Sequence, residues 1–128
     1  MKLLLDTCTF LWLVEGASDL SSDAREAIVD PGNDVLLSSV SAWEIAVKHG
    51  LGRLKLKDSP SVFVPRERER HRIAPLALDE RAVLSLSKLP PLHRDPFDRM
   101  LICQAVECGL SIVTPDPLIR AYPVSAIW

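Results

Sequence analysis

The amino-acid sequence predicts an α/β protein: a single α/β/α domain over residues 1–128, built on a central parallel sheet. Short apolar runs recur along the chain and alternate with longer segments whose apolar residues follow helical spacing. These runs are continuous rather than alternating, which is typical of strands buried on both faces of a sheet. The length of 128 residues and the hydrophobic fraction of 48% suffice for one buried core.

The expected elements of the first half are each bounded by a residue that starts or stops them. Residues 3–5 form a buried strand that ends at Asp6, and the helix after it, residues 7–15, stops at Gly16. Ser21 is the expected N-cap of a second helix, which ends by Pro31. The remaining expected elements are a strand over 35–37, a helix capped by Ser39 or Ser41 and ended by Gly50, a helix over 58–70, and a weaker strand over 72–76.

Proline and glycine delimit the elements of the second half. Asp79 starts a short helix, and Pro90-Pro91 breaks the chain. Asp95-Pro96 opens a helix that runs to about Cys108 and is closed by Gly109. The last expected elements are a strand over 111–114, a helical turn over 117–122 and a strand over 124–127. Strands and helices in this order predict right-handed crossovers.

Several classes of protein are disfavoured by composition and motifs. The chain lacks the glycine-rich patterns of dinucleotide and ATP sites, and its net charge of −2 is not that of a general nucleic-acid binder. The three cysteines form no zinc-binding pattern and suggest a reducing compartment. We find no signal peptide and no apolar stretch approaching the ~18 residues of a membrane span, so we expect a cytoplasmic protein without membrane contact.

Four acids fall where a parallel sheet gathers its binding residues. Asp6 directly follows the first strand, and Asp116 follows the strand over 111–114. Glu44 and Asp98 lie in the first turns of helices, and helices that follow parallel strands begin at that same edge. We therefore expect these four side chains to converge at the carboxyl ends of the strands.

Converging carboxylates repel one another and need compensation. Helix N-termini supply part of it, and a divalent cation supplies more. Mg²⁺ or Mn²⁺ prefers oxygen ligands and often binds one or two carboxylates together with a substrate phosphate. Such a site can activate water for phosphodiester hydrolysis, with one metal or with two.

Each acid also has an ordinary structural interpretation. Asp6 and Asp95 can be helix N-caps, and Asp98 would then occupy the third helical position, where an acid is simply favourable. Glu44 can pair with Lys48 at i,i+4, and Asp116 can be a turn residue before a proline. Their joint placement at one edge is what favours a metal site.

Further candidate residues lie close to these acids in the sequence. His93 could contact RNA or shuttle a proton, although a loop histidine is often merely solvated. Arg99 could hold a phosphate, or be an exposed helical arginine. Phe10, Trp12 and Trp43 could supply an apolar groove for a partner helix, or belong to the core.

At these residues the sequence resembles the PIN-domain family, and is most similar to the VapC-type toxins of bacterial toxin–antitoxin pairs. The ordered motifs that carry the resemblance are Leu3-Leu4-Leu5-Asp6-Thr7-Cys8, Ser41-Ala42-Trp43-Glu44-Ile45, His93-Arg94-Asp95-Pro96-Phe97-Asp98-Arg99-Met100-Leu101-Ile102-Cys103-Gln104-Ala105 and Val113-Thr114-Pro115-Asp116. The resemblance implies a Mg²⁺-dependent endoribonuclease, with Mn²⁺ able to substitute, that cleaves RNA and blocks translation. It also implies a cognate antitoxin and a homodimer.

The resemblance assigns the family's four acids to Asp6, Glu44, Asp98 and Asp116, and Thr114 to the small hydroxyl residue near the last acid. Asp95 is an additional acid near the third position and an alternative to Asp98 as a ligand. Two other readings stay open: a non-catalytic PIN-like module that binds RNA or protein, and a phosphoryl-receiving α/β regulator. The complete acid set disfavours the first, and the missing lysine on a late strand disfavours the second.

Overall fold

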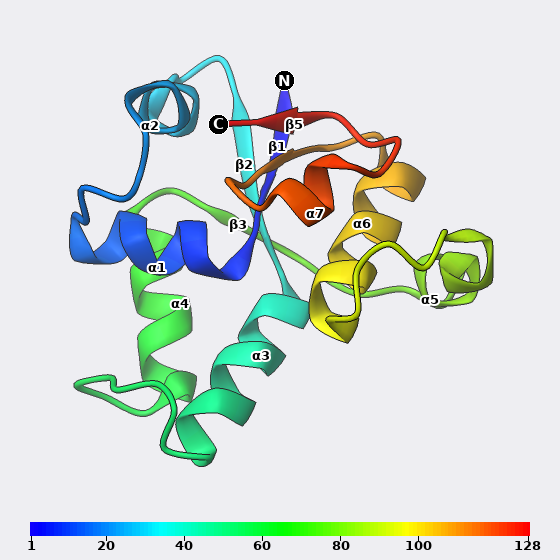
Figure 1. The fold of residues 1–128 in the computed structure, drawn as a ribbon. Coiled ribbons are helices and arrows are strands. Elements are labelled where there is room, and N and C mark those ends of the chain that lie inside the picture. Colours follow the sequence, from blue (N-terminus) through cyan, green and yellow to red (C-terminus); the bar gives the residue numbers. More distant parts are fainter.

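The computed structural model describes residues 1–128 and contains one five-stranded sheet in which every pairing is parallel (Figure 1). The strand order is β3-β2-β1-β4-β5. The strands are β1 (Lys2–Leu5), β2 (Asp34–Ser38), β3 (Ala74–Leu76), β4 (Ser111–Val113) and β5 (Ala126–Ile127). The predicted fold class, helices packed around a central parallel sheet, is confirmed.

Seven α-helices and one 3₁₀-helix surround the sheet. They are α1 (Thr7–Glu15), α2 (Ser22–Val29), α3 (Ser39–Gly50), α4 (Pro60–Arg70), α5 (Glu80–Leu84), η1 (Ser85–Lys88), α6 (Pro96–Cys108) and α7 (Pro117–Arg120). Figure 1 shows α6 and α7 on the opposite side of the sheet from α1, α2 and α4. No helix is long and apolar enough to cross a membrane.

The central strand β1 divides its side chains between two apolar clusters. Leu3 and Leu5 are fully buried in the cluster formed with α1, α2 and α4, whereas Leu4 is fully buried in the cluster formed with α6 and α7. This division follows from the two-residue period of a strand. It explains why residues 3–5 are apolar in succession rather than alternating with polar residues.

The chain reverses the direction of strand addition at β1. From β1 it adds β2 and β3 on one side, and it later returns to add β4 and β5 on the other. In open parallel sheets the binding crevice lies outside the carboxyl ends of the strands at such a switch point. The carboxyl end of β1 is Leu5, so the next residue, Asp6, stands at the switch.

The element boundaries differ from the sequence-based prediction at a few positions. The N-cap of α3 is Ser38, not Ser39 or Ser41, because the Ser38 hydroxyl accepts the Val40 N–H at 3.0 Å. Gly50 lies inside α3, whose C-cap is Leu51. The strands β3 and β5 are shorter than predicted, since both are edge strands that pair on one side.

Candidate metal and catalytic site

Three aspartates at the carboxyl edge of the sheet are N-caps of the helices that begin there. Asp6 accepts the Thr9 N–H at 2.8 Å and caps α1, and Asp116 accepts the Leu118 N–H at 2.8 Å and caps α7. Asp95 accepts the Phe97 N–H at 2.8 Å and caps α6, with Pro96 as the first helical residue. The interpretation of Asp6 and Asp95 as N-caps is therefore confirmed, whereas Asp116, expected as a turn residue before Pro117, is an N-cap as well.

The capping role leaves part of each carboxylate free for other partners. Asp116 caps with Oδ1 and turns Oδ2 towards the ring of His93, 3.1 Å away. Asp98, in the first turn of α6, presents its own Oδ2 to the same ring nitrogen at 3.0 Å. Because a carboxylate has two oxygens, one aspartate can cap a helix with the first oxygen and offer the second to a metal.

Glu44 is buried and both of its oxygens are engaged. Its side chain lies on α3, 5% exposed, and Oε1 accepts a 2.6 Å hydrogen bond from the Thr7 hydroxyl. Oε2 pairs with the ammonium group of Lys48, the i,i+4 partner expected from the sequence. Glu44 therefore brings to the site a negative charge that the protein already partly neutralises.

Asp6 carries a buried charge that neighbouring hydroxyl groups support. The residue is 3% exposed, and burial raises the pKa of its carboxyl above the ordinary value. Hydrogen bonds from Thr114, Thr9 and Cys8 oppose that rise in pKa, because they stabilise the ionised form. This environment favours a bound cation, which would offset the same desolvation.

Burial and the neighbouring carboxylates act together on Asp98. Burial, followed by the negative charges of Asp95 and Glu44, raises the pKa of its carboxyl from 3.8 to about 7. Asp6 contributes in the same direction, and His93 opposes it. Four acids from the starts of α1 and α6 and from α3 therefore repel one another here, and His93 links Asp116 to the group.

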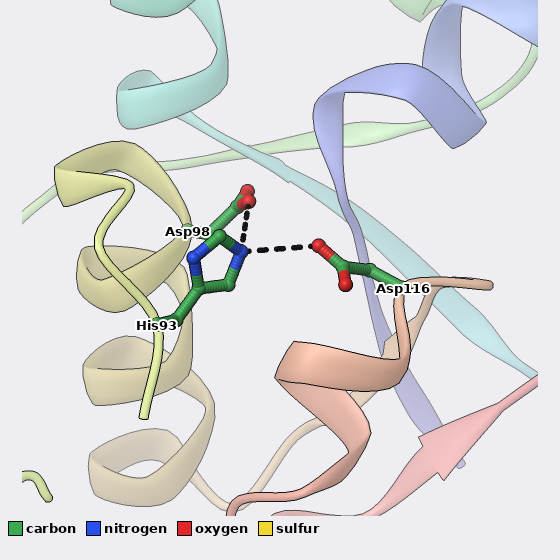
Figure 2. Close-up of side chains that lie close together, drawn as sticks. All are labelled: His93, Asp98 and Asp116. Atoms are coloured by element: carbon green, nitrogen blue, oxygen red, sulfur yellow. Dashed lines mark hydrogen bonds and ion pairs between the residues drawn. The ribbon is translucent and has the colours of Figure 1, made fainter. Parts of the chain in front are cut away.

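His93 stands between Asp98 and Asp116 (Figure 2). Its side chain is 11% exposed, so it is not the solvated loop histidine that the sequence left open. The segment before α6 is held by Tyr122, whose hydroxyl accepts the N–H groups of Leu92 and His93 at 3.1 and 2.8 Å. Nothing in the local sequence pattern indicates this contact, because Tyr122 is 29 residues away from His93.

Arg99 and Thr114 lie in the site region but face inwards. The Arg99 guanidinium donates to the carbonyl of Pro90 at 3.1 Å and to the Tyr122 hydroxyl at 3.3 Å, so it holds the segment before α6. Thr114 is fully buried, and its hydroxyl accepts the Asp116 N–H at 3.1 Å. The positions of Arg99 and Thr114 therefore suit a role in orienting the carboxylates more than a role in contacting a substrate.

Sequence reasoning missed Thr7 and Tyr122. Thr7 is adjacent to Asp6 in sequence but points to Glu44, 37 residues away, and also lies 3.0 Å from the Ser41 hydroxyl. The sequence did contain a signal for Thr7: it is a hydroxyl residue in the first turn of a helix that starts at the acidic edge. Tyr122 had no signal of this kind.

The donor chemistry of this site fits a hard divalent cation. Carboxylate oxygens from Asp98 and Asp116 and a nitrogen of His93 lie within 4.8 Å of one another. Burial first, and then the negative charges of Asp95 and Glu44, raise the pKa of Asp98, and His93 offsets only part of that rise. Oxygen-rich sites with excess negative charge are those that Mg²⁺ and Mn²⁺ select.

The pKa of Asp98 predicts how the stability of the metal-free protein depends on pH. The folded state binds the proton with a pKa of about 7, and the ordinary value is 3.8. The folded state therefore holds more protons between these values, so the free energy of unfolding should fall as pH rises from about 4 to about 7.

Urea unfolding in EDTA at several pH values measures this dependence. Asp98→Asn should flatten the fall, because the asparagine does not titrate. Equal pH dependence in wild type and Asp98→Asn would show that Asp98 does not carry the buried charge.

The fold and the site together give the class of this molecule: it is an α/β protein with a cluster of acids at the carboxyl edge of a parallel sheet. The family model of the PIN domain matches residues 3–124. The chain therefore belongs to the PIN domain family.

Individual relatives extend this comparison. Over 63 residues the chain is 36% identical to Ribonuclease VapC16 of Mycobacterium tuberculosis (strain ATCC 25618 / H37Rv), a match that covers 49% of this chain and 45% of that relative. The fold is similar to a chain of VapBC2 from Rickettsia felis bound to a DNA fragment from their promoter, with a TM-score of 0.75, 14% identity, and coverage of 99% of this chain and 98% of that one. It is also similar to a chain of VapBC-1 from nontypeable Haemophilus influenzae, with a TM-score of 0.66, 16% identity, and coverage of 99% and 97%.

Proposed function

We propose that this protein is a Mg²⁺- or Mn²⁺-dependent endoribonuclease and the toxin of a toxin–antitoxin pair, with residues 1–128 acting as one nuclease domain in the cytoplasm. Membership of the PIN family and the local likeness to a ribonuclease support it. The observation that carries it is the convergence of Asp6, Glu44, Asp95 and Asp98 on one edge, together with the link through His93 to Asp116.

The residues that would hold the metal are Asp6, Asp98 and Asp116, with Glu44 and Asp95 adding charge and outer contacts. When bound, the metal would supply a water of lowered pKa and offset the charge on the phosphodiester. Asp98 must be ionised to act as a ligand; its pKa of about 7 is that of the metal-free protein, and a bound cation would lower it.

Neighbouring side chains keep the acids in place for this work. Thr114 and Thr9 support the ionised form of Asp6, and Thr7 orients Glu44. Lys48 neutralises Glu44 and keeps part of the negative charge from repelling the phosphate. Arg99 fixes the segment that precedes α6.

Incubation of the purified protein with a labelled single-stranded RNA tests the proposed activity. Cleavage is expected with millimolar Mg²⁺ or Mn²⁺ and is expected to stop with EDTA. DNA of the same sequence is the control for substrate class. Binding of RNA without cleavage under every metal condition would instead support a PIN-like module that binds without cutting.

The proposed partner is an antitoxin that lies across the acidic edge. An inserted Arg or Lys would form charge-assisted hydrogen bonds with the carboxylates. The structure changes the expected apolar groove: Phe10 is fully buried, and Trp12 is half-buried and packs against Trp128 with ring centroids 5.8 Å apart. The exposed candidates are Trp43 and Val47 on α3 and its C-cap Leu51, each four residues after the one before.

Replacement of the partner's inserted cation by alanine should restore cleavage more than it weakens binding. The apolar contacts with α3 should keep the complex together, whereas the cation blocks the carboxylates. Cleavage rates and dissociation constants of the two complexes measure the difference. A stable complex that cuts RNA at the free enzyme's rate would rule out this form of inhibition.

The proposed homodimer follows from the family resemblance alone. Light scattering of the purified protein checks it, with a mass of twice 14.2 kDa expected.

A further inference from the structure

The imidazole of His93 occupies the space between two of the proposed metal ligands (Figure 2). Its Nε2 atom lies 3.0 Å from Oδ2 of Asp98 and 3.1 Å from Oδ2 of Asp116. Both carboxylates direct an oxygen to the same nitrogen. The ring therefore joins residues from α6 and from the start of α7 that otherwise repel each other.

A backbone hydrogen bond determines which ring nitrogen carries the proton. The Asp95 N–H donates to Nδ1 of His93 at 3.1 Å, so Nδ1 is the acceptor and carries no proton. The neutral ring then has its proton on Nε2, and that N–H donates towards Asp98 and Asp116. A nitrogen that carries a proton has no free lone pair, so in this arrangement Nε2 cannot ligate a metal.

Contacts from the rest of the fold hold the ring in this place. The Tyr122 hydroxyl accepts the backbone N–H of His93 at 2.8 Å, and Arg99 donates to its carbonyl at 3.4 Å. Tyr122 is 3% exposed and belongs to the apolar cluster under α6 and α7. The buried Tyr122 therefore fixes the backbone of His93 relative to the core.

We propose that His93 is a positioning residue that stands in for the metal: its Nε2–H holds Asp98 and Asp116 together in the metal-free protein, and the metal and the ring compete for the same place. The inference rests on the proposed function, because it takes these carboxylates as metal ligands. Asp98 and Asp116 would hold the cation, and the Nε2–H of His93 points into the space between their Oδ2 atoms. A cation held by both carboxylates would therefore displace the ring and loosen its bond to Asp95.

The opposite arrangement is that His93 itself ligates the metal. It would require Nε2 to lose its proton and Nδ1 to gain one, and the Asp95 N–H would then face another N–H. The two arrangements predict opposite effects of removing the ring. If His93 is a ligand, metal binding weakens without it, and if His93 stands in for the metal, binding tightens.

Electron paramagnetic resonance of free Mn²⁺, measured without RNA, tests the inference. His93→Ala should bind Mn²⁺ about tenfold or more tightly than wild type, since hydrogen bonds to charged groups shift equilibria by such factors. His93→Gln should stay near wild type, because its amide N–H can donate to the same carboxylates. His49→Ala, which removes a histidine from the far end of α3, is the control for loss of any histidine.

A second variant and a second measurement test the inference even if the His93→Ala protein does not fold. Tyr122→Phe removes the hydroxyl that holds the backbone of Leu92 and His93, so it should also tighten Mn²⁺ binding. In wild type, Mn²⁺ should speed amide hydrogen exchange at these two residues. Slower exchange, or unchanged or weaker binding by both His93→Ala and Tyr122→Phe, would overturn the inference.

The same measurements separate this inference from the proposed function. Wild type that binds Mn²⁺ and cuts RNA, with His93→Ala binding equally, would contradict the inference alone. Tighter binding by His93→Ala in a protein that never cuts RNA would contradict the function alone. Absence of Mn²⁺ binding by wild type would overturn both.

Discussion

Asp6→Asn is expected to lower RNA cleavage by at least about 100-fold while the protein stays folded. Removal of groups that merely orient a metal's ligands already costs about 10–100-fold in affinity or activity, and Asp6 is proposed to be a ligand. The fold should survive, because asparagine is as good an N-cap as aspartate and can still accept the Thr9 N–H. Loss of a buried charge should leave the melting temperature unchanged or raise it.

Cleavage rates under single-turnover conditions, together with thermal melts, measure both parts of this prediction. Asp23→Asn is the matched control, because Asp23 is exposed on α2, remote from the acidic edge. Near wild-type cleavage by a folded Asp6→Asn protein would remove Asp6 from the site.

Saturating Mn²⁺ is expected to raise the melting temperature of the wild type by roughly 10 °C over its value in EDTA. A ligand present at 100 times its dissociation constant stabilises the folded state by about 2.7 kcal/mol, and that energy corresponds to such a shift in a protein of this size. The physical source is that a bound cation would offset the burial, and then the repulsion by neighbouring carboxylates, that raise the pKa of Asp98.

Asp98→Asn should lose most of this metal effect and melt higher than wild type in EDTA, because the buried charge is gone. Melts of both proteins with EDTA and with millimolar Mn²⁺ make the comparison. Identical wild-type midpoints, at a concentration that saturates cleavage, would contradict metal binding at these carboxylates.

The general form of the fold and the place of the site could be predicted from the sequence. Continuous apolar runs such as residues 3–5 indicate strands buried on both faces, and their carboxyl ends share one edge of a parallel sheet. Asp6 and Asp116 follow two such runs directly or within three residues. The edge that gathers the acids therefore follows from strand order and local spacing alone.

The contacts that tune the site could not be predicted in this way. The bonds from Thr7 to Glu44 and from the His93 N–H to Tyr122 span 37 and 29 residues, and no local periodicity encodes such pairs. The segment before α6 contains two prolines and has neither helical nor strand spacing, so the direction of His93 is decided by tertiary contacts. The sequence could also not show that one aspartate both caps a helix and offers a second oxygen to the site.

Cleavage of RNA in ¹⁸O-labelled water tests most directly whether the carboxylate edge is a metal-dependent hydrolytic site. Attack by water at the phosphorus inserts one solvent oxygen into the product phosphate at each cut, whereas attack by the neighbouring 2′-hydroxyl forms a 2′,3′-cyclic phosphate without solvent oxygen. We predict one ¹⁸O atom per cut with Mg²⁺, and no cutting with EDTA or with Asp6→Asn. A cyclic phosphate product that continues to form in EDTA would contradict the proposed site.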